Sequence, residues 1–364
     1  MIGRVYGTGS YLPIRTVSND ELSHVMETSD EWIRERTGIR FRHVALEETT
    51  SDMAAEAAAR ALKNGEVNAD EIELILTATS SSDVIYPSAA CIVQKRIGAQ
   101  NALAFDLNGA CSGFVIAFNT AQAYIRAGIY KTILVVGAES MSRLVDWSDR
   151  STSVLFGDGA GALILKAEEG DHYWQTGHSD GTKDFVLTLR SKSLFEEQDD
   201  NPKDVLSKSD EGSSVEEHDD VSKNAEDISR KKKSHKTGIC MDGQEVFKFA
   251  VRKVPELTEE LLEKSGLKIA DIDFFILHQA NERIVKAAAK KLKVDMSRFP
   301  INMENYANTS AASIPILLDE LVQTGRLRKG QKILLAGFGA GLTWAGSILE
   351  WYISLRDQTK TNCG

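Results

Sequence analysis

The feature that most constrains the fold of this sequence is a set of paired segments that recur about 200 residues apart. The pairs are ADEIELIL and ADIDFFIL, starting at Ala69 and Ala270; NGACSGFVIAF and NTSAASIPILL, starting at Asn108 and Asn308; and TILVVGA and KILLAGF, starting at Thr132 and Lys332. All three keep one order and nearly one offset, which indicates a duplicated half rather than chance similarity. Each half is expected to contain a strand, a small-residue turn, a helix and a further strand.

The apolar segments of the chain alternate between short runs and longer amphipathic ones. Short runs at 74–80, 132–140, 161–166, 274–280 and 332–339 predict buried strands. Longer stretches at 51–65, 111–128, 254–266 and 282–292 predict helices, several of which end near a glycine. This alternation indicates an α/β layered fold. We expect an N-terminal half over residues 1–167 and a C-terminal half over residues 168–364.

Residues 191–236 interrupt this pattern with 13 acidic and 9 basic side chains and few large apolar ones. Such a composition cannot bury enough apolar surface to order itself, so we expect a charged, mobile insertion in the second half. Its basic run RKKKSHK, from Arg230, lies beside acidic residues and lacks interleaved aromatic residues. A solvated loop is therefore favoured over a nucleic-acid site.

Composition narrows the possible partners and the compartment. A formal net charge of -10 argues against general attraction to nucleic acid or to an anionic membrane. Four cysteines are too few for a disulfide scaffold, and their spacing matches no zinc site, so a reducing cytoplasmic setting and no metal are expected. The N-terminus lacks a signal-peptide pattern. Residues 333–355 are interrupted by glycines and Glu350, which favours two buried strands over a membrane-spanning helix.

Cys111 is the first candidate for chemistry. It lies in DLNGACSGF, between a predicted strand that ends near Leu107 and an apolar helix. A thiol at a helix start is expected to have a lowered pKa, because unpaired N–H groups and the helix dipole stabilise the thiolate. Small neighbours leave room for a substrate. The alternative is that Cys111 is a small buried apolar residue.

Two further polar residues occupy positions related to Cys111 by the repeat. His278 ends the strand FFIL, at the edge where α/β folds place ligands, although a structural histidine would also fit there. Asn308 precedes the helix that duplicates the Cys111 helix, where an asparagine commonly caps the helix. A pseudo-two-fold axis between the halves would bring the three side chains together, which points to nucleophilic catalysis. The glycines of GFGAGLTW suit backbone N–H groups that approach a reacting oxygen.

Five motifs together resemble those of one family. DLNGACSGF, SVLFGDGAGALIL, ILHQANERI, NYANTSAASIP and GFGAGLTWAG follow the order found in the thiolase superfamily and, within it, in the β-ketoacyl-[acyl-carrier-protein] synthase III family. The resemblance runs from residue 1 to about 355, apart from the charged insertion. It implies a thiolase-like fold, in which two duplicated βαβαβ-type halves form a five-layer α-β-α-β-α core.

The resemblance also implies a reaction and roles for the site residues. The family starts type II fatty acid synthesis by moving a short acyl group from acyl-CoA to a cysteine and condensing it with malonyl-carrier protein as carbon dioxide leaves. Cys111 would be the nucleophile, and His278 and Asn308 would hold the malonyl thioester. Backbone N–H groups of Cys111 and Ala340 would form the oxyanion hole; Ala340 replaces a glycine of many members. Phe338 would lie beside the thiol, and no cofactor is implied.

Further matches concern binding partners. By resemblance, coenzyme A would contact Trp32, Arg36, Arg150, Gly243, Phe247 and Asn281. The acidic carrier protein would dock on Lys248, Arg283, Lys290 and Lys291, which local charge complementarity would favour although the whole chain is acidic. The family forms homodimers, and Tyr86 would cross the interface to limit the partner's acyl pocket. We therefore expect a short starter, from acetyl to branched five-carbon acyl groups.

Three other functions are compatible with these residues. One is a specialised synthase of secondary metabolism that extends with a CoA thioester. Another is a Cys-His-Asn hydrolase that passes the acyl group to water. The third is an acyl-binding protein with an inert Cys111, whose thiol would titrate near the ordinary value of about 8.5.

Overall fold

The structure, a computed structural model, describes residues 1–189 and 238–353, which form two main sheets. The strands of the first are β1 (Ile2–Tyr11), β4 (Leu74–Ala78), β5 (Leu103–Leu107), β6 (Thr132–Ser140) and β7 (Asp158–Glu168), and those of the second are β8 (Tyr173–Ser179), β11 (Phe274–Leu277), β12 (Lys332–Gly339) and β13 (Thr343–Glu350). Their orders are β1-β7-β6-β4-β5 and β8-β13-β12-β11. In both sheets two antiparallel pairings are followed by a parallel one. The predicted duplication is therefore confirmed.

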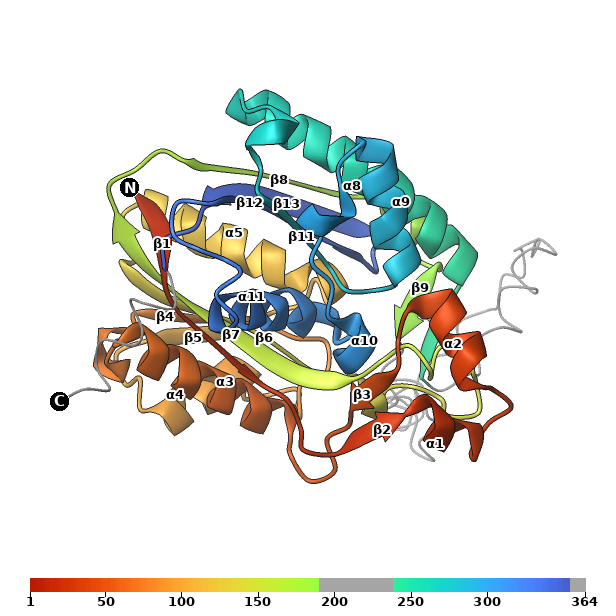
Figure 1. The fold of residues 1–364 in the computed structure, drawn as a ribbon. Helices are drawn as coiled ribbons and strands as arrows, with labels where there is room; N and C mark the ends of the chain where they lie inside the picture. Colours follow the sequence, from red (N-terminus) through yellow and green to blue (C-terminus); the bar gives the residue numbers. More distant parts are fainter. Residues whose placement is uncertain (190–237, 354–364) are drawn as a thin grey trace, which may run out of the picture.

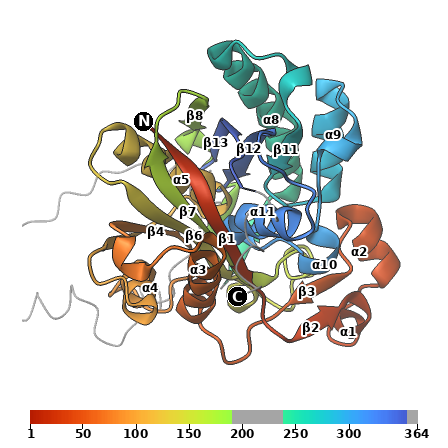
Figure 2. The same ribbon diagram turned by 60° about the vertical axis from the view of Figure 1, so that its left-hand side comes forward.

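Helices form three layers around and between the two sheets (Figure 1; Figure 2). The outer face of the first sheet carries α3 (Thr50–Gly65) and α4 (Ala89–Ile97). The outer face of the second sheet carries α8 (Gly243–Ser265) and α9 (Glu282–Leu292). Between the two sheets lie α5 (Gly113–Arg126) and α11 (Ser313–Gln323). The layers follow the order α-β-α-β-α, as the resemblance implied.

Side-chain alternation along the strands explains why both faces of each sheet are covered. In β4, Leu74 and Leu76 belong to the central core with Phe118 of α5, whereas Ile75 packs with α3 and α4 on the outer face. Phe275 of β11 likewise packs on the outer side, with Leu257 of α8. Successive residues of a strand point to opposite faces, so strands buried on both sides read as continuous apolar runs.

The predicted elements match the structure closely, with two differences. The helix expected over 254–266 starts earlier, as α8 at Gly243, because Asp242 caps it by accepting the N–H groups of Gln244 and Glu245 at 3.1 Å. Pro255 is accommodated inside this helix. The structure also shifts the alignment of the first pair of repeated segments by one residue. Leu74 pairs with Ile133 of β6, and Phe274 pairs with Ile333, the equivalent residue of β12.

The two central helices start in the same unusual way. A 3₁₀ turn precedes each: η2 (Ala110–Ser112) before α5 and η8 (Ser310–Ala312) before α11. The first residue of each turn has a positive φ, 46° at Ala110 and 47° at Ser310. Each turn packs on a strand of the opposite half, η2 on β12 and η8 on β6. A Cβ atom at Gly137 of β6 would lie 2.4 Å from the Ala311 carbonyl oxygen, so this contact needs glycine.

Smaller elements lie at the periphery. They are β2 (Thr16–Ser18), α1 (Asn19–Ser23), α2 (Asp30–Thr37), β3 (Phe41–His43), β9 (Leu187–Leu189), β10 (Ile239–Met241) and α10 (Met303–Tyr306). Residues 332–350 form the antiparallel pair β12 and β13, as predicted in place of a membrane span. Within residues 1–189 and 238–353, the helices are too short or too polar to cross a membrane. The charged insertion 191–236, with its basic run from Arg230, lies outside the described residues.

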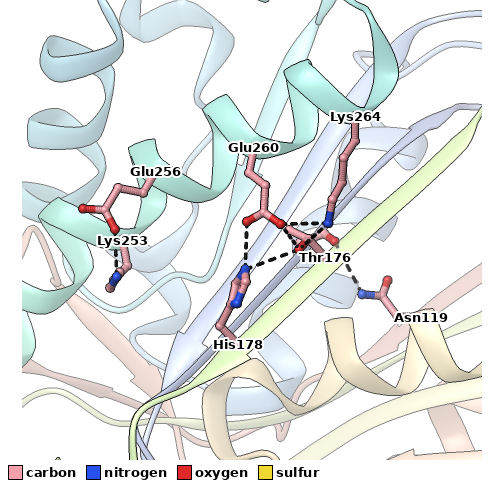
Figure 3. Close-up of polar contacts among 8 residues, drawn as sticks. Asn119, Thr176, His178, Lys253, Glu256, Glu260 and Lys264 are labelled. Atoms are coloured by element: carbon pink, nitrogen blue, oxygen red, sulfur yellow. Dashed lines mark hydrogen bonds and ion pairs between the residues drawn. The ribbon is translucent and has the colours of Figure 1, made fainter.

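A polar network joins α8 to β8 on the outer surface (Figure 3). Glu260 accepts from Lys264 at 2.7 Å, from His178 at 2.8 Å and from the hydroxyl of Thr176. Partial burial raises the pKa of this carboxyl, but the three donors outweigh burial and lower the pKa to about 2.

Replacing Glu260 is expected to weaken this surface more at neutral pH than in acid. A carboxylate whose folded pKa lies below its unfolded value stabilises the fold above about pH 4.5, and this contribution is lost as the pH falls towards 2. Glu260→Gln should lower the free energy of unfolding by about 1 kcal/mol, as for partly exposed charge networks. Urea unfolding at pH 7 and pH 3 measures the difference. Glu256→Gln, which removes only an exposed pair with Lys253, is the matched control and should show a smaller change.

Candidate active site

Cys111 lies in the middle of the turn η2, directly before α5. The side chain is 8% exposed. Strand β12 passes so close that a Cβ atom on Gly339 would lie 2.9 Å from the Cys111 Cβ atom. The turn after β12 is tied to the same place, because the hydroxyl groups of Ser112 and Thr343 hydrogen-bond at 2.6 Å and Thr343 donates to the Ala340 carbonyl oxygen at 2.9 Å. Gly339 therefore allows the backbone of β12 to approach Cys111. Whether backbone N–H groups of this motif hold a reacting oxygen stays a prediction.

The surroundings of Cys111 keep its thiol protonated at rest. Burial raises the thiol pKa to about 12, against the lowering effect of a hydrogen bond with Ser310, and the nearby carboxylate of Glu139 raises it further. The expected lowering of the thiol pKa at the helix start is therefore not met, because desolvation dominates. A raised pKa leaves little thiolate at neutral pH, so it does not by itself separate a catalytic thiol from an inert one. Ionisation of this sulfur must be coupled to a proton acceptor.

His278 follows β11, where its backbone N–H donates to the Ala336 carbonyl oxygen at 2.9 Å. Its Nδ1 lies 2.7 Å from the Ser313 hydroxyl, which also accepts the Gln279 N–H at 3.4 Å. The Ser313 hydroxyl can donate its hydrogen to Nδ1, and in that tautomer the imidazole carries its own hydrogen on Nε2. Burial lowers the histidine pKa to about 3. At neutral pH His278 is thus uncharged.

Asn308 is held by the backbone of the first half. Its N–H donates to the Leu155 carbonyl oxygen at 2.9 Å, and its own carbonyl oxygen accepts from Gly157 at 3.1 Å. The side-chain oxygen accepts the Ser310 N–H at 2.8 Å, and the amide N–H groups have no hydrogen bond to the part of the chain that the structure describes. Asn308 does not cap α11, whose N-cap position is Ala312. The simple capping role considered for this residue is therefore excluded.

Shared neighbours bring these three residues into one buried region. The turn η8, which follows Asn308, packs on the turn η2 that carries Cys111, and Ser313 at the end of η8 hydrogen-bonds His278. The Phe338 ring, which is 2% exposed, contacts the imidazole edge-to-face with ring centres 5.3 Å apart. A buried thiol, a neutral imidazole and an amide thus lie where the two halves meet.

The residues matched to coenzyme A contacts form a surface cluster in which most are joined. The Trp32 ring lies 4.5 Å from the Arg36 guanidinium carbon and 5.3 Å from that of Arg150. Asn281 caps α9 and donates to the Arg36 carbonyl oxygen at 2.9 Å. Phe247 lies on α8, which packs against α9, and Gly243 is the first residue of α8. Such a cluster can stack on an aromatic base and pair with phosphate.

The basic residues matched to carrier-protein docking lie on α8 and α9. Arg283, Lys290 and Lys291 are exposed on α9, and Arg283 covers the Phe247 ring at 5.5 Å. Lys248 pairs with Glu245 at 3.0 Å. Tyr86 is 83% exposed in the loop before α4, so it lines no acyl pocket within its own chain. An interface role for Tyr86 stays a prediction.

Sequence reasoning missed three polar residues of this region. Ser310 and Ser313 belong to the motif around Asn308, and Glu139 lies at the end of an apolar run, so their positions in the sequence predict no separate role for them. A carboxylate that closes the buried strand TILVVGAES was the available signal, because an acidic residue is rarely fully buried without a partner. Within the described residues, no cluster of three His, Cys, Asp or Glu side chains is arranged to hold a metal ion.

Replacing Gly339 tests how tightly β12 fixes the thiol. The added methyl group of Gly339→Ala would displace Cys111, and a displacement of about 1 Å can cost about 10²-fold in rate. We expect a loss of that size in acylation of Cys111, measured by intact-protein mass spectrometry with short acyl-CoA. Gly177→Ala on β8 is the control, because its nearest neighbour would be an ordinary 3.5 Å away. An unchanged acylation rate in Gly339→Ala would contradict the tight fit.

Comparisons with known proteins agree with this arrangement. The family model described as 3-oxoacyl-[acyl-carrier-protein (ACP)] synthase III matches residues 105–181, and the model of its C-terminal part matches residues 262–351. A β-ketoacyl-[acyl-carrier-protein] synthase III from Clostridium acetobutylicum is 45% identical over 95% of this chain and 98% of its own length. One from Xylella fastidiosa is 42% identical over 96% and 99%.

Solved structures give the same result. The 3-oxoacyl-[acyl-carrier-protein] synthase III of Aquifex aeolicus superposes with a TM-score of 0.82 at 37% identity, covering 96% of this chain and 100% of that one. A priming β-ketosynthase of a polyketide biosynthetic pathway superposes with a TM-score of 0.84 at 34% identity, covering 96% of both chains. With relatives at 42–45% identity over nearly the whole chain and a matching fold, this chain belongs to the β-ketoacyl-[acyl-carrier-protein] synthase III family.

Proposed function

We propose that this protein is an acyltransferase that starts type II fatty acid synthesis, taking a short acyl group from acyl-CoA and condensing it with malonyl-carrier protein. The product is the 3-oxoacyl-carrier protein, with CoA and carbon dioxide released. The observation that carries the proposal is the meeting of a buried thiol, a neutral imidazole and a free amide at Cys111, His278 and Asn308.

In the first half-reaction the Cys111 sulfur attacks the thioester carbonyl of acyl-CoA. A carbon–sulfur bond forms to the enzyme, the bond to CoA breaks, and CoA leaves as a thiol with the proton that Cys111 has lost. The carbonyl oxygen carries negative charge in between. Backbone N–H groups of Cys111 and Ala340 are proposed to hold this oxygen, because donors fixed before the reaction stabilise the charge without reorganising.

In the second half-reaction the malonyl carboxylate leaves as carbon dioxide. The bond between the carboxylate carbon and C2 breaks, and its electrons form an enolate whose oxygen is held by His278 Nε2 and the Asn308 amide. The enolate carbon then attacks the acyl carbon on Cys111, the bond from that carbon to sulfur breaks, and Cys111 leaves as a thiolate that takes up a proton from solvent. A neutral imidazole suits this task, since it must donate a hydrogen bond rather than carry a proton away.

The binding assignments follow from the same proposal. The cluster around Trp32 would hold coenzyme A, and the exposed basic residues of α8 and α9 would receive the acidic carrier protein. We also propose that the protein is a cytoplasmic homodimer with Tyr86 at its interface and that the reaction needs no cofactor beyond its substrates. The two halves of the chain are proposed to divide between residues 167 and 168. This division falls one residue before the end of β7, the last strand of the first sheet in sequence.

The test is intact-protein mass spectrometry after mixing the protein with a panel of acyl-CoAs, followed by malonyl-carrier protein and detection of the ketoacyl product. Acylation confined to Cys111, discharged into a ketoacyl-carrier protein, supports the proposal and names the starter. Discharge only to water supports the hydrolase. No acylation by any acyl-CoA supports the acyl-binding protein.

A second candidate is a specialised synthase that extends with malonyl-CoA. It is favoured by the similarity to the priming β-ketosynthase, which has the same fold and matches 96% of this chain. Comparing the rate of discharge by malonyl-carrier protein with that by malonyl-CoA separates the two functions. Faster discharge by malonyl-CoA would replace fatty acid initiation with this second function.

A further inference from the structure

Glu139 is a buried carboxylate that the mechanism above leaves unused. It lies one residue before the end of β6 and is 0% exposed. Its oxygens accept from the Ser80 hydroxyl at 2.9 Å, the Ser80 N–H at 3.1 Å and the Ser81 hydroxyl at 2.6 Å. Burying a carboxylate without such donors is costly. These contacts, all from the loop after β4, therefore fix the carboxylate within the first half of the chain.

One oxygen of this carboxylate also binds the second half. Glu139 Oε1 accepts from the hydroxyl of Ser310, the first residue of the turn η8, at 3.1 Å. The turn comes this close because Gly137, two residues earlier and on the same face of β6, has no Cβ atom. The same face of β6 thus supplies a glycine that admits the turn and a carboxylate that binds it.

The equivalent place in the other half is built differently. Gly339 of β12 occupies the repeat position of Glu139, and Ala110 of η2 occupies that of Ser310. A Cβ atom at Gly339 would lie 2.9 Å from the Cys111 Cβ atom, so this half has no room for a side chain there. Both turns start at a positive φ that residues with a Cβ atom seldom adopt. The carboxylate and the hydroxyl therefore distinguish η8 from the turn that carries the nucleophile.

Ser310 in turn sets the side chain of Asn308. The Ser310 N–H donates to Asn308 Oδ1 at 2.8 Å. A backbone N–H can only donate, so the amide atom that faces it is the oxygen and the amide nitrogen points away from Ser310. The bonds of Asn308 to Leu155 and Gly157 hold its backbone but not the rotation of its amide group. The orientation of that amide therefore depends on the direction of the Ser310 N–H.

We propose that Glu139 is a positioning residue for condensation, which holds the Ser310 hydroxyl so that the Ser310 N–H keeps the Asn308 amide nitrogen directed at the enolate oxygen. The proposal rests on the proposed function above. Glu139 itself touches no substrate and moves no proton. A donor held in place before the reaction stabilises the developing charge without reorganising. An amide turned the other way would present its oxygen to the enolate and repel it.

This role predicts different effects on the two half-reactions. Glu139→Ala removes the acceptor of the Ser310 hydroxyl, and condensation should fall about 10²-fold, the cost of a catalytic group displaced by about 1 Å. Acylation should remain close to the wild-type rate, because it uses the sulfur and backbone donors rather than Asn308. The measurement is carbon dioxide release from malonyl-carrier protein by enzyme that has already been acylated, beside the acylation rate.

Two milder variants keep the test valid if Glu139→Ala does not fold, which circular dichroism checks. Ser310→Ala removes only the hydroxyl, and Ala110 shows that alanine is accommodated at the start of such a turn. It should show the same selective loss of condensation. Glu139→Gln keeps a side-chain oxygen that can accept from Ser310, so it should retain most of the condensation rate. A loss in Glu139→Gln as large as in Glu139→Ala would contradict a role as hydrogen-bond acceptor.

Asp319 of α11 provides the matched control. It is also a buried carboxylate, and it accepts from two hydroxyl groups of β1 at 2.7 Å and 2.6 Å. Asp319→Asn should leave both half-reactions at the wild-type rate. Equal loss of acylation and condensation in Glu139→Ala and Ser310→Ala would overturn the proposal, because it would indicate general damage to the site.

A double variant shows whether Glu139 acts through Asn308. Effects of residues that act through one group are not additive, whereas independent effects on the free energy add. In an Asn308→Ala background, Glu139→Ala should therefore change condensation by less than about twofold. A further loss of about 10²-fold in this background, the full effect of a displaced group, would overturn the positioning role.

Crystal structures of the variants give an answer that does not depend on activity. In Glu139→Ala and Ser310→Ala, the N–H of residue 310 should lie beyond about 3.2 Å from the Asn308 side chain, outside hydrogen-bond distance. Retention of the 2.8 Å contact in both variants would overturn the link from Glu139 to Asn308. A displaced turn, together with a wild-type protein that does not condense, would overturn the proposed function alone.

Discussion

Cys111→Ser is expected to abolish acyl transfer, with a loss of about 10⁴-fold or more, the scale seen when a nucleophile is removed from a buried catalytic site. The hydroxyl that replaces the thiol is a far weaker acid, and burial already raises the pKa of the thiol to about 12. His278, whose pKa burial lowers to about 3, is too weak a base to ionise it. Intact-protein mass spectrometry with short acyl-CoA should detect no acyl adduct on a folded variant.

Cys91→Ser is the matched control for this experiment. Cys91 is a free, half-buried cysteine whose thiol donates to the Ala104 carbonyl oxygen at 3.5 Å, away from the site. The Cys91 variant should be acylated at the wild-type rate. Loss of the adduct in Cys91→Ser, or its persistence in Cys111→Ser, would show that the acyl group is carried elsewhere.

The second large effect is expected in the condensation step. His278→Ala and Asn308→Ala each remove one donor to the enolate oxygen, and one such donor is worth about 2.7–4 kcal/mol, or 10²–10³ in rate. Acylation should be affected much less, because it uses backbone donors and the sulfur. The measurement is carbon dioxide release from malonyl-carrier protein with enzyme that has already been acylated, beside the acylation rate itself.

The pH dependence of condensation gives an independent check on His278. With its pKa near 3, the imidazole remains neutral between pH 5 and pH 8, so the rate should show no transition near 6.5 from this group. His172→Ala, on the exposed surface, is the control and should leave both half-reactions unchanged. Equal loss of acylation and condensation in His278→Ala, or a transition near 6.5 that this variant removes, would contradict the donor role.

Most of the fold could be predicted because its sequence signals are either local or repeated in the two halves. Strands such as β6 and β12 are continuous apolar runs bounded by polar residues, and their bounds were predicted to the residue. The repeat then fixed how the elements correspond. The start of α8 was missed because Pro255 marked an apparent helix beginning, whereas the cap at Asp242 lies well upstream. Short polar caps are weak sequence signals next to a proline.

The site was predictable only in part, because its polar contacts join the two halves. The motifs located Cys111, His278 and Asn308, but the lowered pKa expected for the thiol was wrong, since burial depends on packing that no local pattern encodes. The link from Ser310 to Glu139 spans 171 residues of sequence. Contacts of that kind follow from the pseudo-two-fold arrangement rather than from the spacing of residues along the chain.

The crossed packing of the turns η2 and η8 also limits how substrates can reach the thiol. Each turn lies against a strand of the opposite half, η2 on β12 and η8 on β6, so a hinge motion that parted the halves would pull both turns from their supports. Enzymes that work by hinge closure move two domains as units around the bound ligand. On the proposed function, the acyl chain and the malonyl arm must therefore reach Cys111 without the two halves parting. Selection among substrates then depends on the side chains around the thiol rather than on a closing motion of the halves.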